Sequence, residues 1–184
     1  MTYRFYTTTG DDGYTGLLGE GRVAKEDARI EALGAIDEAM AALGMARAAS
    51  KARQTGKLLL VVQRDLYNLM AEVSATPANA AKFRQVGAAR VTWLEEQADS
   101  LSSQVEVPRE FILPGDTLGG AALDLARTVV RRAERRVSGL LHRGEIENTA
   151  LLRYLNRLSS LCFVLELLEN RTIRKGGPTL AKAA

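Results

Sequence analysis

The sequence predicts an all-α protein, a five-helix antiparallel bundle, on three observations. Hydrophobic residues recur at helical spacing from Lys25 almost to the C-terminus, and no alternating run of useful length suggests a β-strand. Short breaks separate the periodic segments, and a length of 184 residues suits one domain with a single core. We therefore expect one domain over 1–184, with an irregular loop over 1–25, a helical bundle over 26–172 and a frayed tail over 173–184.

Two helices are predicted in the first half of the chain, over about 26–50 and about 54–75. Pro77 should end the second helix, because proline cannot continue the backbone hydrogen-bond ladder. Each helix carries an apolar stripe at three-and-four spacing. The stripes consist of Ile30, Leu33, Ile36, Met40, Leu43 and Met45 in the first helix, and of Leu58, Leu59, Val62, Leu66, Leu69 and Met70 in the second.

Three further helices are predicted over about 79–104, 121–142 and 145–171. The third has Val86, Val91, Leu94, Ala98 and Leu101 on its apolar stripe, and Arg143 with Gly144 should form a tight reversal between the last two. Short connections make successive helices antiparallel. The connection over 105–120 is unusual because it holds an apolar patch with its own turn, Phe111-Ile112-Leu113-Pro114-Gly115.

The composition excludes several classes of protein. With 46% hydrophobic and 26% charged residues, the chain has no apolar run near the roughly 20 residues of a membrane span, and its first residues lack the apolar stretch of a secretory signal. We therefore expect a cytoplasmic protein. Cys162 is the only cysteine and His142 the only histidine, which excludes an intrachain disulfide and a zinc-binding set of side chains. We expect Cys162 in the core and His142 at a helix end.

The predicted fourth helix concentrates arginine on one border of its apolar face. At about 100° per residue, Arg131, Glu134 and Arg135 lie beside Arg127, whereas Arg132 and Arg136 face away from the core. Stacked like charges destabilise a helix, so this column suggests a docked anion, and the guanidinium fork suits phosphate. A solvated or carboxylate-paired face is the alternative. Nucleic acid is disfavoured, because the chain has few aromatic residues for stacking and no base-reading motif.

The N-terminal segment is the second candidate site. It reads Thr7-Thr8-Thr9-Gly10-Asp11-Asp12-Gly13-Tyr14-Thr15-Gly16, which is too polar and glycine-rich for a core. Glycine lets backbone amides approach an oxyanion, threonine hydroxyls add donors, and Lys25 would add a cation near the start of the first helix. A phosphate cradle is one interpretation. A disordered tail would look similar, because the chain lacks a Walker motif.

Seven segments together resemble one family, the PduO-type ATP:cob(I)alamin adenosyltransferases. They follow the family's order and spacing and cover nearly the whole chain, although each alone would be a weak signal. They are 7–13, Arg22-Val23-Ala24-Lys25, Arg29-Ile30-Glu31, Gly34-Ala35-Ile36-Asp37-Glu38, Phe111-Ile112-Leu113-Pro114-Gly115, 126–136 and Tyr154-Leu155-Asn156-Arg157-Leu158-Ser159.

The resemblance implies a homotrimer with each active site between two subunits, and it implies roles for specific residues. Phe111 would lie under the corrin and keep the lower base off the cobalt, while Arg127 and Asp37 would bridge subunits beside the corrinoid. Arg127 and Arg131 are the expected catalytic residues, and Mg²⁺ would bind the ATP phosphates with Glu134 as a candidate ligand. The expected nucleotide-binding residues are Thr7, Thr8, Thr9, Gly10, Thr15, Gly16, Lys25, Arg131, Arg132, Glu134, Arg135 and Asn156.

The implied reaction transfers the 5′-deoxyadenosyl group of ATP to the cobalt of cob(I)alamin. Cob(I)alamin is itself a strong nucleophile, so the absence of an obvious catalytic serine, cysteine or histidine is consistent with this reaction. A cobalamin reductase and an adenosylcobalamin-dependent enzyme would be its partners, with no nucleic acid or membrane. The alternatives are a non-catalytic carrier or sensor of ATP or adenosylcobalamin, and a structural bundle without a ligand.

Several positions depart from the family pattern without removing any of the expected phosphate ligands. Tyr14 and Asp116 stand where small or hydroxyl-bearing residues are usual. Ala39 replaces a leucine, Met40 an asparagine and Ser160 an aspartate. Met40 and Ser160 are expected to alter polar contacts between helices or around the corrinoid.

Overall fold

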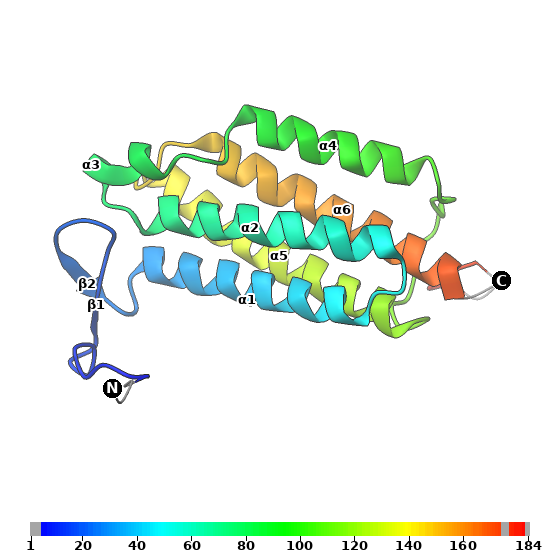
Figure 1. Ribbon diagram of the computed structural model, residues 1–184, viewed down its shortest axis with the longest axis horizontal. Coiled ribbons are helices and arrows are strands. Elements are labelled where there is room, and N and C mark those ends of the chain that lie inside the picture. The colour runs from blue at the N-terminus through cyan, green and yellow to red at the C-terminus, as the bar shows by residue number, and fades with distance from the viewer. Residues whose placement is uncertain (1–4, 174–176, 183–184) are drawn as a thin grey trace.

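Five long helices lie side by side in the computed structural model, which describes residues 5–173 and 177–182 (Figure 1). They are α1 (Ala28–Ala49), α2 (Arg53–Ser74), α4 (Ala88–Ser102), α5 (Leu118–His142) and α6 (Thr149–Ile173). Successive long helices run in opposite directions, and α5 packs against both α1 and α6. Within the described ranges, no helix combines the length and apolar character that a membrane span requires.

The prediction of five helices is confirmed for the long ones but omits a sixth among the described residues. The predicted helix over 79–104 is divided into α3 (Pro77–Ala80), a 3₁₀ turn (Ala81–Phe83) and α4. Hydrogen bonds to distant residues fix the segment between the 3₁₀ turn and α4. Asn148 Nδ2 donates to the Val86 carbonyl at 3.0 Å, and Arg84 Nε donates to the Glu72 carboxylate at 3.2 Å. These partners are distant in sequence, so local periodicity did not reveal them.

The apolar stripes form one core, with a few displaced members. Ile36, Leu43, Leu59, Leu66 and Leu94 are fully buried, as their spacing predicted. Met45 is 62% exposed, so its assignment to the stripe was wrong; Ala42 and Ala46 are the buried positions of that turn. Cys162 is buried, as predicted.

Helix ends are set partly by side chains from other helices. The Asp27 carboxylate accepts a hydrogen bond from the Arg29 amide at 2.8 Å and caps α1. The start of α2 has no side-chain cap of its own; Glu169 of α6 instead accepts hydrogen bonds from the amides of Lys51 and Ala52. Asn148 caps α6, so this helix begins at Thr149 and not near 145.

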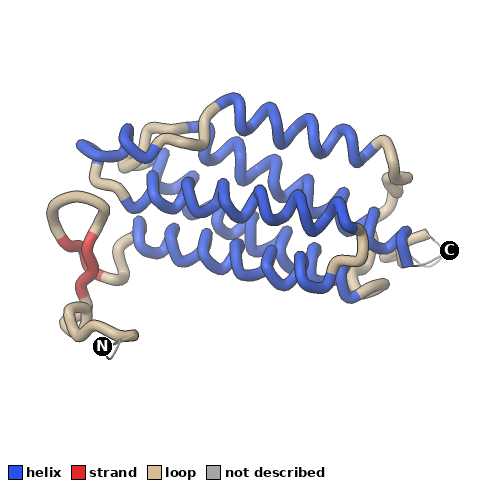
Figure 2. Tube along the Cα trace, in the orientation of Figure 1, coloured by secondary structure: helices blue, strands red, loops and turns tan. Residues whose placement is uncertain are grey.

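The N-terminal segment contains a short antiparallel hairpin, which corrects the prediction that it has no strand. Strand β1 (Tyr14–Gly16) pairs with β2 (Arg22–Ala24), and each strand has three residues, too few to show an alternating pattern. Figure 2 shows the hairpin standing beyond the end of the bundle. Leu18 joins the hairpin to the end of α2: its amide donates to Ser74 at 2.9 Å and its carbonyl accepts from Thr76 at 3.2 Å.

The tail over 177–182 is paired, so the prediction of a frayed C-terminus is wrong for these residues; residues 174–176 and 183–184 of the predicted tail lie outside the described residues. The Leu113 amide donates to the Thr179 carbonyl at 2.8 Å, and the Ala181 amide donates to the Phe111 carbonyl at 2.7 Å. Asp116 accepts two hydrogen bonds from Thr179, at 2.8 Å from the amide and 2.6 Å from the hydroxyl. The tail therefore pairs through an isolated antiparallel bridge with the loop that carries Phe111.

Candidate functional site

A hollow of about 370 Å³ lies against the N-terminal hairpin and is here called the cradle. Backbone turns shape the segment before β1: the Asp11 amide donates to Thr8 and the Gly13 amide to Gly10, both at 3.2 Å. Six of the seven predicted residues in this part of the chain line the cradle. They are Thr7, Thr9, Gly10, Thr15, Gly16 and Lys25. Thr8 is not a lining residue and contributes its carbonyl to the turn.

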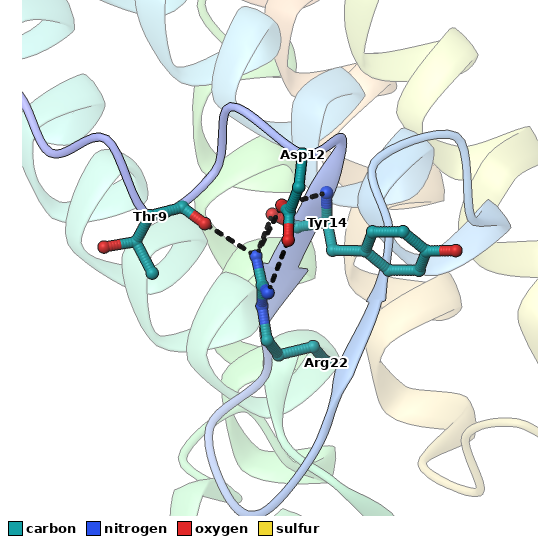
Figure 3. Close-up of polar contacts among 4 residues, drawn as sticks. All are labelled: Thr9, Asp12, Tyr14 and Arg22. Carbon is teal, nitrogen blue, oxygen red and sulfur yellow. Dashed lines mark hydrogen bonds and ion pairs between the residues drawn. The ribbon is translucent and has the colours of Figure 1, made fainter.

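Arg22 organises the cradle, and sequence analysis did not assign it a role (Figure 3). Its guanidinium donates to both carboxylate oxygens of Asp12 at 2.8 Å, to the Thr9 carbonyl at 2.7 Å and to the Tyr14 carbonyl at 3.0 Å. The hydrogen bond from Arg22, helped by the Tyr14 amide, lowers the pKa of Asp12. Arg22 belongs to the Arg22-Val23-Ala24-Lys25 segment that marked the family resemblance, which was the available signal.

Lys25 supplies a cation at the edge of the cradle. A Cβ atom at Gly10 would lie 3.0 Å from the Lys25 ammonium nitrogen, so glycine leaves the space that this side chain uses. Across the described part of the chain, Lys25 makes no ion pair. The ammonium group is therefore available to an anion in the cradle.

The arginines of α5 divide into paired and unpaired groups. Val130, Ala133 and Val137 are fully buried, which confirms the predicted core side of this helix. Arg132 forms an ion pair with Glu38, and Arg136 lies 3.7 Å from Glu31. The exposed Arg131 and Arg135 have no hydrogen-bond or ion-pair partner in residues 5–173 and 177–182.

Glu134 and Asn156 are brought together across α5 and α6. Asn156 Nδ2 donates to Glu134 Oε1 at 2.8 Å, and Asn156 Oδ1 accepts from Arg157 at 2.6 Å. Among the described residues, no group of three His, Cys, Asp or Glu side chains could hold a metal ion. A cation at Glu134 would therefore need ligands from another molecule.

Phe111 and Arg127 meet at a second hollow of about 380 Å³, here called the Phe111 hollow. The Phe111 side chain is 87% exposed, which is unusual for a large apolar residue. Arg127 Nε donates to Asp124 at 2.7 Å, and both residues line the hollow together with Phe163. Phe111 and Arg127, which were both expected beside the corrinoid, thus line the same hollow.

Glu166 is a buried carboxyl near this hollow that sequence analysis did not single out. It is fully buried, and neither carboxyl oxygen has a hydrogen-bond partner. Burial, together with the neighbouring charge of Asp124, raises the pKa of Glu166 to about 7, whereas Arg127 opposes the shift. The signal in the sequence was a glutamate surrounded by Val164, Leu165 and Leu167.

The cradle and the Phe111 loop lie at opposite ends of the bundle. The hairpin stands beside the start of α1, whereas the α4–α5 connection that carries Phe111 lies at the other end (Figure 1). Asp37 is exposed on α1 and has no ion-pair partner in the described chain, and Arg127 pairs within its own chain. One chain therefore does not join the two halves of the predicted site.

Comparison with known proteins identifies the family. The family model of cobalamin adenosyltransferase matches residues 5–169. A corrinoid adenosyltransferase of Citrobacter freundii is 34% identical over 171 residues, covering 92% of this chain and 97% of that protein. One from Mycobacterium tuberculosis is 39% identical over 172 residues, covering 91% of this chain and 89% of that protein.

Solved structures agree with the sequence relatives. A variant PduO-type ATP:corrinoid adenosyltransferase from Lactobacillus reuteri, complexed with ATP, superposes with a TM-score of 0.87 at 29% identity, covering 97% of this chain and 100% of that one. Another variant, complexed with cobalamin and ATP, has a TM-score of 0.85 at 30% identity and covers 98% of both chains. Since the family match includes the cradle, the arginines of α5 and the Phe111 loop, the chain belongs to the cobalamin adenosyltransferase family.

Proposed function

We propose that this protein transfers the 5′-deoxyadenosyl group of ATP to the cobalt of cob(I)alamin and releases triphosphate. The observation that carries this proposal is a set of cations without an ion-pair partner among the described residues, Lys25 at the cradle and Arg131 with Arg135 on α5. A polyphosphate is the ligand that best satisfies such a set, because each phosphate accepts charge-assisted hydrogen bonds.

The cobalt supplies the nucleophile, so the protein needs to align the reactants and stabilise the leaving group. The Co(I) electron pair attacks C5′ of ATP, a Co–C bond forms, and the C5′–O5′ bond breaks to release triphosphate. Cobalt is oxidised formally to Co(III). Lys25, Arg131 and Arg135 would stabilise the negative charge that grows on the triphosphate, while the cradle holds its phosphates in place.

Mg²⁺ fits this site only as a companion of ATP. The Glu134 carboxylate is the nearby hard oxygen donor, and phosphate oxygens would complete a Mg²⁺ coordination sphere. When bound, Mg²⁺ neutralises charge on the triphosphate. The Asn156 amide holds Glu134 Oε1, which leaves the second carboxylate oxygen, Oε2, to face the ion.

The corrinoid half of the site would be the Phe111 hollow. An apolar, exposed Phe111 below the corrin would keep a lower axial ligand off the cobalt. A cobalt without axial donors accepts an electron more readily, which favours the Co(I) state that the transfer requires. A separate cobalamin reductase would supply that electron, and an adenosylcobalamin-dependent enzyme would receive the product.

A homotrimer with shared active sites would join the two halves. One chain holds the hairpin and the loop that carries Phe111 at opposite ends of its bundle, so a second copy would contribute one half of the site. In such an assembly, the exposed Asp37 of one chain could replace Asp124 as the partner of Arg127 in the next. Sedimentation analysis of the native protein and of Asp37→Asn tests this arrangement; a native monomer with full turnover would contradict it.

Single-turnover spectroscopy tests the proposed reaction against the carrier or sensor. Chemically reduced cobalamin mixed with Mg·ATP should lose its cob(I) absorbance and give a light-sensitive alkyl product. A carrier would bind the ligands without this change. A structural bundle would bind neither, and Mg·ATP would then leave the melting temperature unchanged, because only a ligand of the native state stabilises it.

A further inference from the structure

A larger cavity lies beside the Phe111 hollow and has no place in the reaction as described so far. It encloses about 700 Å³ and is here called the tail cavity. Pro108, Arg109 and Glu110 line both spaces, so the two are neighbours across this short segment. Its apolar walls come from the loop after α4, the end of α6 and the C-terminal tail, through Val105, Pro108, Leu167, Pro178 and Leu180.

The tail cavity is a built feature of the fold, because its outer wall is held by specific bonds. Ile112 and Leu180 form an antiparallel bridge, which fixes the register of the tail on the Phe111 loop. The two hydrogen bonds from Thr179 to Asp116 anchor the same segment. The tail thus forms one wall of the cavity and supports the loop that carries Phe111.

One cation of this region is free to bind a ligand. Arg109 lines both cavities, is exposed, and makes no hydrogen bond or ion pair to any residue that the structure describes. The other charged lining groups are engaged or acidic: Arg171 donates to the Gln104 carbonyl, Glu110 lies 3.8 Å from Lys182, and Glu106 is a carboxylate. A largely apolar space in which Arg109 is the available guanidinium among the described lining residues suits an aromatic group attached to a single phosphate.

We propose that the tail cavity receives the lower nucleotide of cobalamin after its base has left the cobalt. This inference rests on the proposed function, since Phe111 would displace that base. The displaced group is a dimethylbenzimidazole joined through ribose to one phosphodiester. The apolar walls would take the bicyclic base, and Arg109 would bind the phosphodiester at the boundary between the two cavities. A volume of about 700 Å³ lies within the range of small-molecule sites, roughly 300–1,000 Å³.

The test compares cobalamin with cobinamide, which has the same corrin ring but no lower nucleotide. Leu180→Trp narrows the tail cavity, and Arg109→Gln removes its free charge. Each variant should weaken binding of cob(II)alamin roughly tenfold more than it weakens binding of cob(II)inamide, as expected for the loss of one charge-assisted or well-packed contact. Spectral titration measures both affinities without turnover. Leu60→Trp, on an exposed leucine of α2, controls for an added tryptophan.

The outcomes separate this inference from the proposed function. If the native protein binds both corrinoids but adenosylates neither, the proposed function is wrong, and the binding selectivity still decides the role of the cavity. If Arg109→Gln weakens both corrinoids equally, or neither, the lower nucleotide does not occupy the cavity. Because Leu180→Trp could also displace the tail, the Arg109 variant is the decisive one.

Discussion

Arg22 and Asp12 join strand β2 to the turn before β1 through a two-pronged ion pair, with both nitrogen–oxygen distances at 2.8 Å (Figure 3). The same guanidinium binds the carbonyls of Thr9 and Tyr14, so one side chain holds three points of the N-terminal segment. The Tyr14 ring lies 5.9 Å from this guanidinium, which gives the unusual tyrosine a role in the same cluster. These contacts hold together the segment that forms the cradle.

Replacing Arg22 with lysine should weaken ATP binding with little effect on the bundle. Lysine keeps the charge but cannot bind Asp12 and both carbonyls at once. We expect the KM for ATP to rise roughly three- to tenfold. ATP would then have to order the cradle as it binds, and this ordering lowers the affinity. Steady-state kinetics with varied ATP measures this. Arg143→Lys, at an exposed arginine paired with Glu145, is the matched control; an equal effect there would remove Arg22 from the proposed role.

Replacing Arg131 with alanine should reduce turnover without loosening the fold. Arg131 is exposed and unpaired in the described chain, so its removal breaks no intrachain contact. We expect kcat to fall by about a hundredfold or more, as for the loss of one group that stabilises transition-state charge. Single-turnover rates and the melting temperature are the two measurements. Arg64→Ala provides an exposed arginine on α2 for comparison, and normal turnover in Arg131→Ala would contradict the assignment.

Replacing Phe111 with alanine should impair the corrinoid chemistry and leave stability unchanged. The side chain is 87% exposed, so little apolar burial is lost from the folded chain. We expect cob(II)alamin bound to the variant to retain its lower axial base and to be reduced more slowly. Electron paramagnetic resonance of the bound Co(II) reports that ligand directly. Tyr67→Ala, at another exposed aromatic residue, should behave as the native protein.

Because Glu166 is a buried carboxyl with a raised pKa, it should make the protein less stable as pH rises. Because the folded chain holds the proton more tightly, the free energy of unfolding should fall as pH rises from the ordinary value of 4.5 through about 7. Glu166→Gln should therefore be more stable than the native protein above this window, by at most about 3 kcal/mol, and nearly equal below it.

Denaturant unfolding at pH values below, within and above that window measures the effect of Glu166. Glu169→Gln is the informative contrast, because Glu169 is equally buried but accepts hydrogen bonds from the amides at the start of α2. That variant should lose stability across the whole range. A Glu166→Gln protein with the same pH dependence as the native chain would show that Glu166 does not titrate in this window.

The arginine column shows what could be predicted from the sequence about the site. Helical geometry alone put Arg131 and Arg135 beside the core stripe and Arg132 with Arg136 away from it, and the burial of Val130 and Ala133 agrees. It could not reveal that Arg132 and Arg136 bind Glu38 and Glu31 of α1, whereas Arg131 has no partner among the described residues. Those pairings depend on how α1 packs on α5.

The contacts of the cradle, at the N-terminus, could not be predicted from the sequence either. Its glycine and threonine content was visible, but the three-residue strands were too short for any periodic signal. The ion pair of Arg22 with Asp12 spans ten positions and required the hairpin to form first.

The sequence by itself determined the long helices, the buried stripe on each and the family, because these depend on residue type and on spacing along one element. The tertiary structure alone decided the break before α4, the binding of the tail to the Phe111 loop and the isolation of Glu166. Each of these arises from groups that are distant in the chain and become neighbours only when the helices pack. Their hydrogen bonds and desolvation therefore leave no local pattern in the sequence.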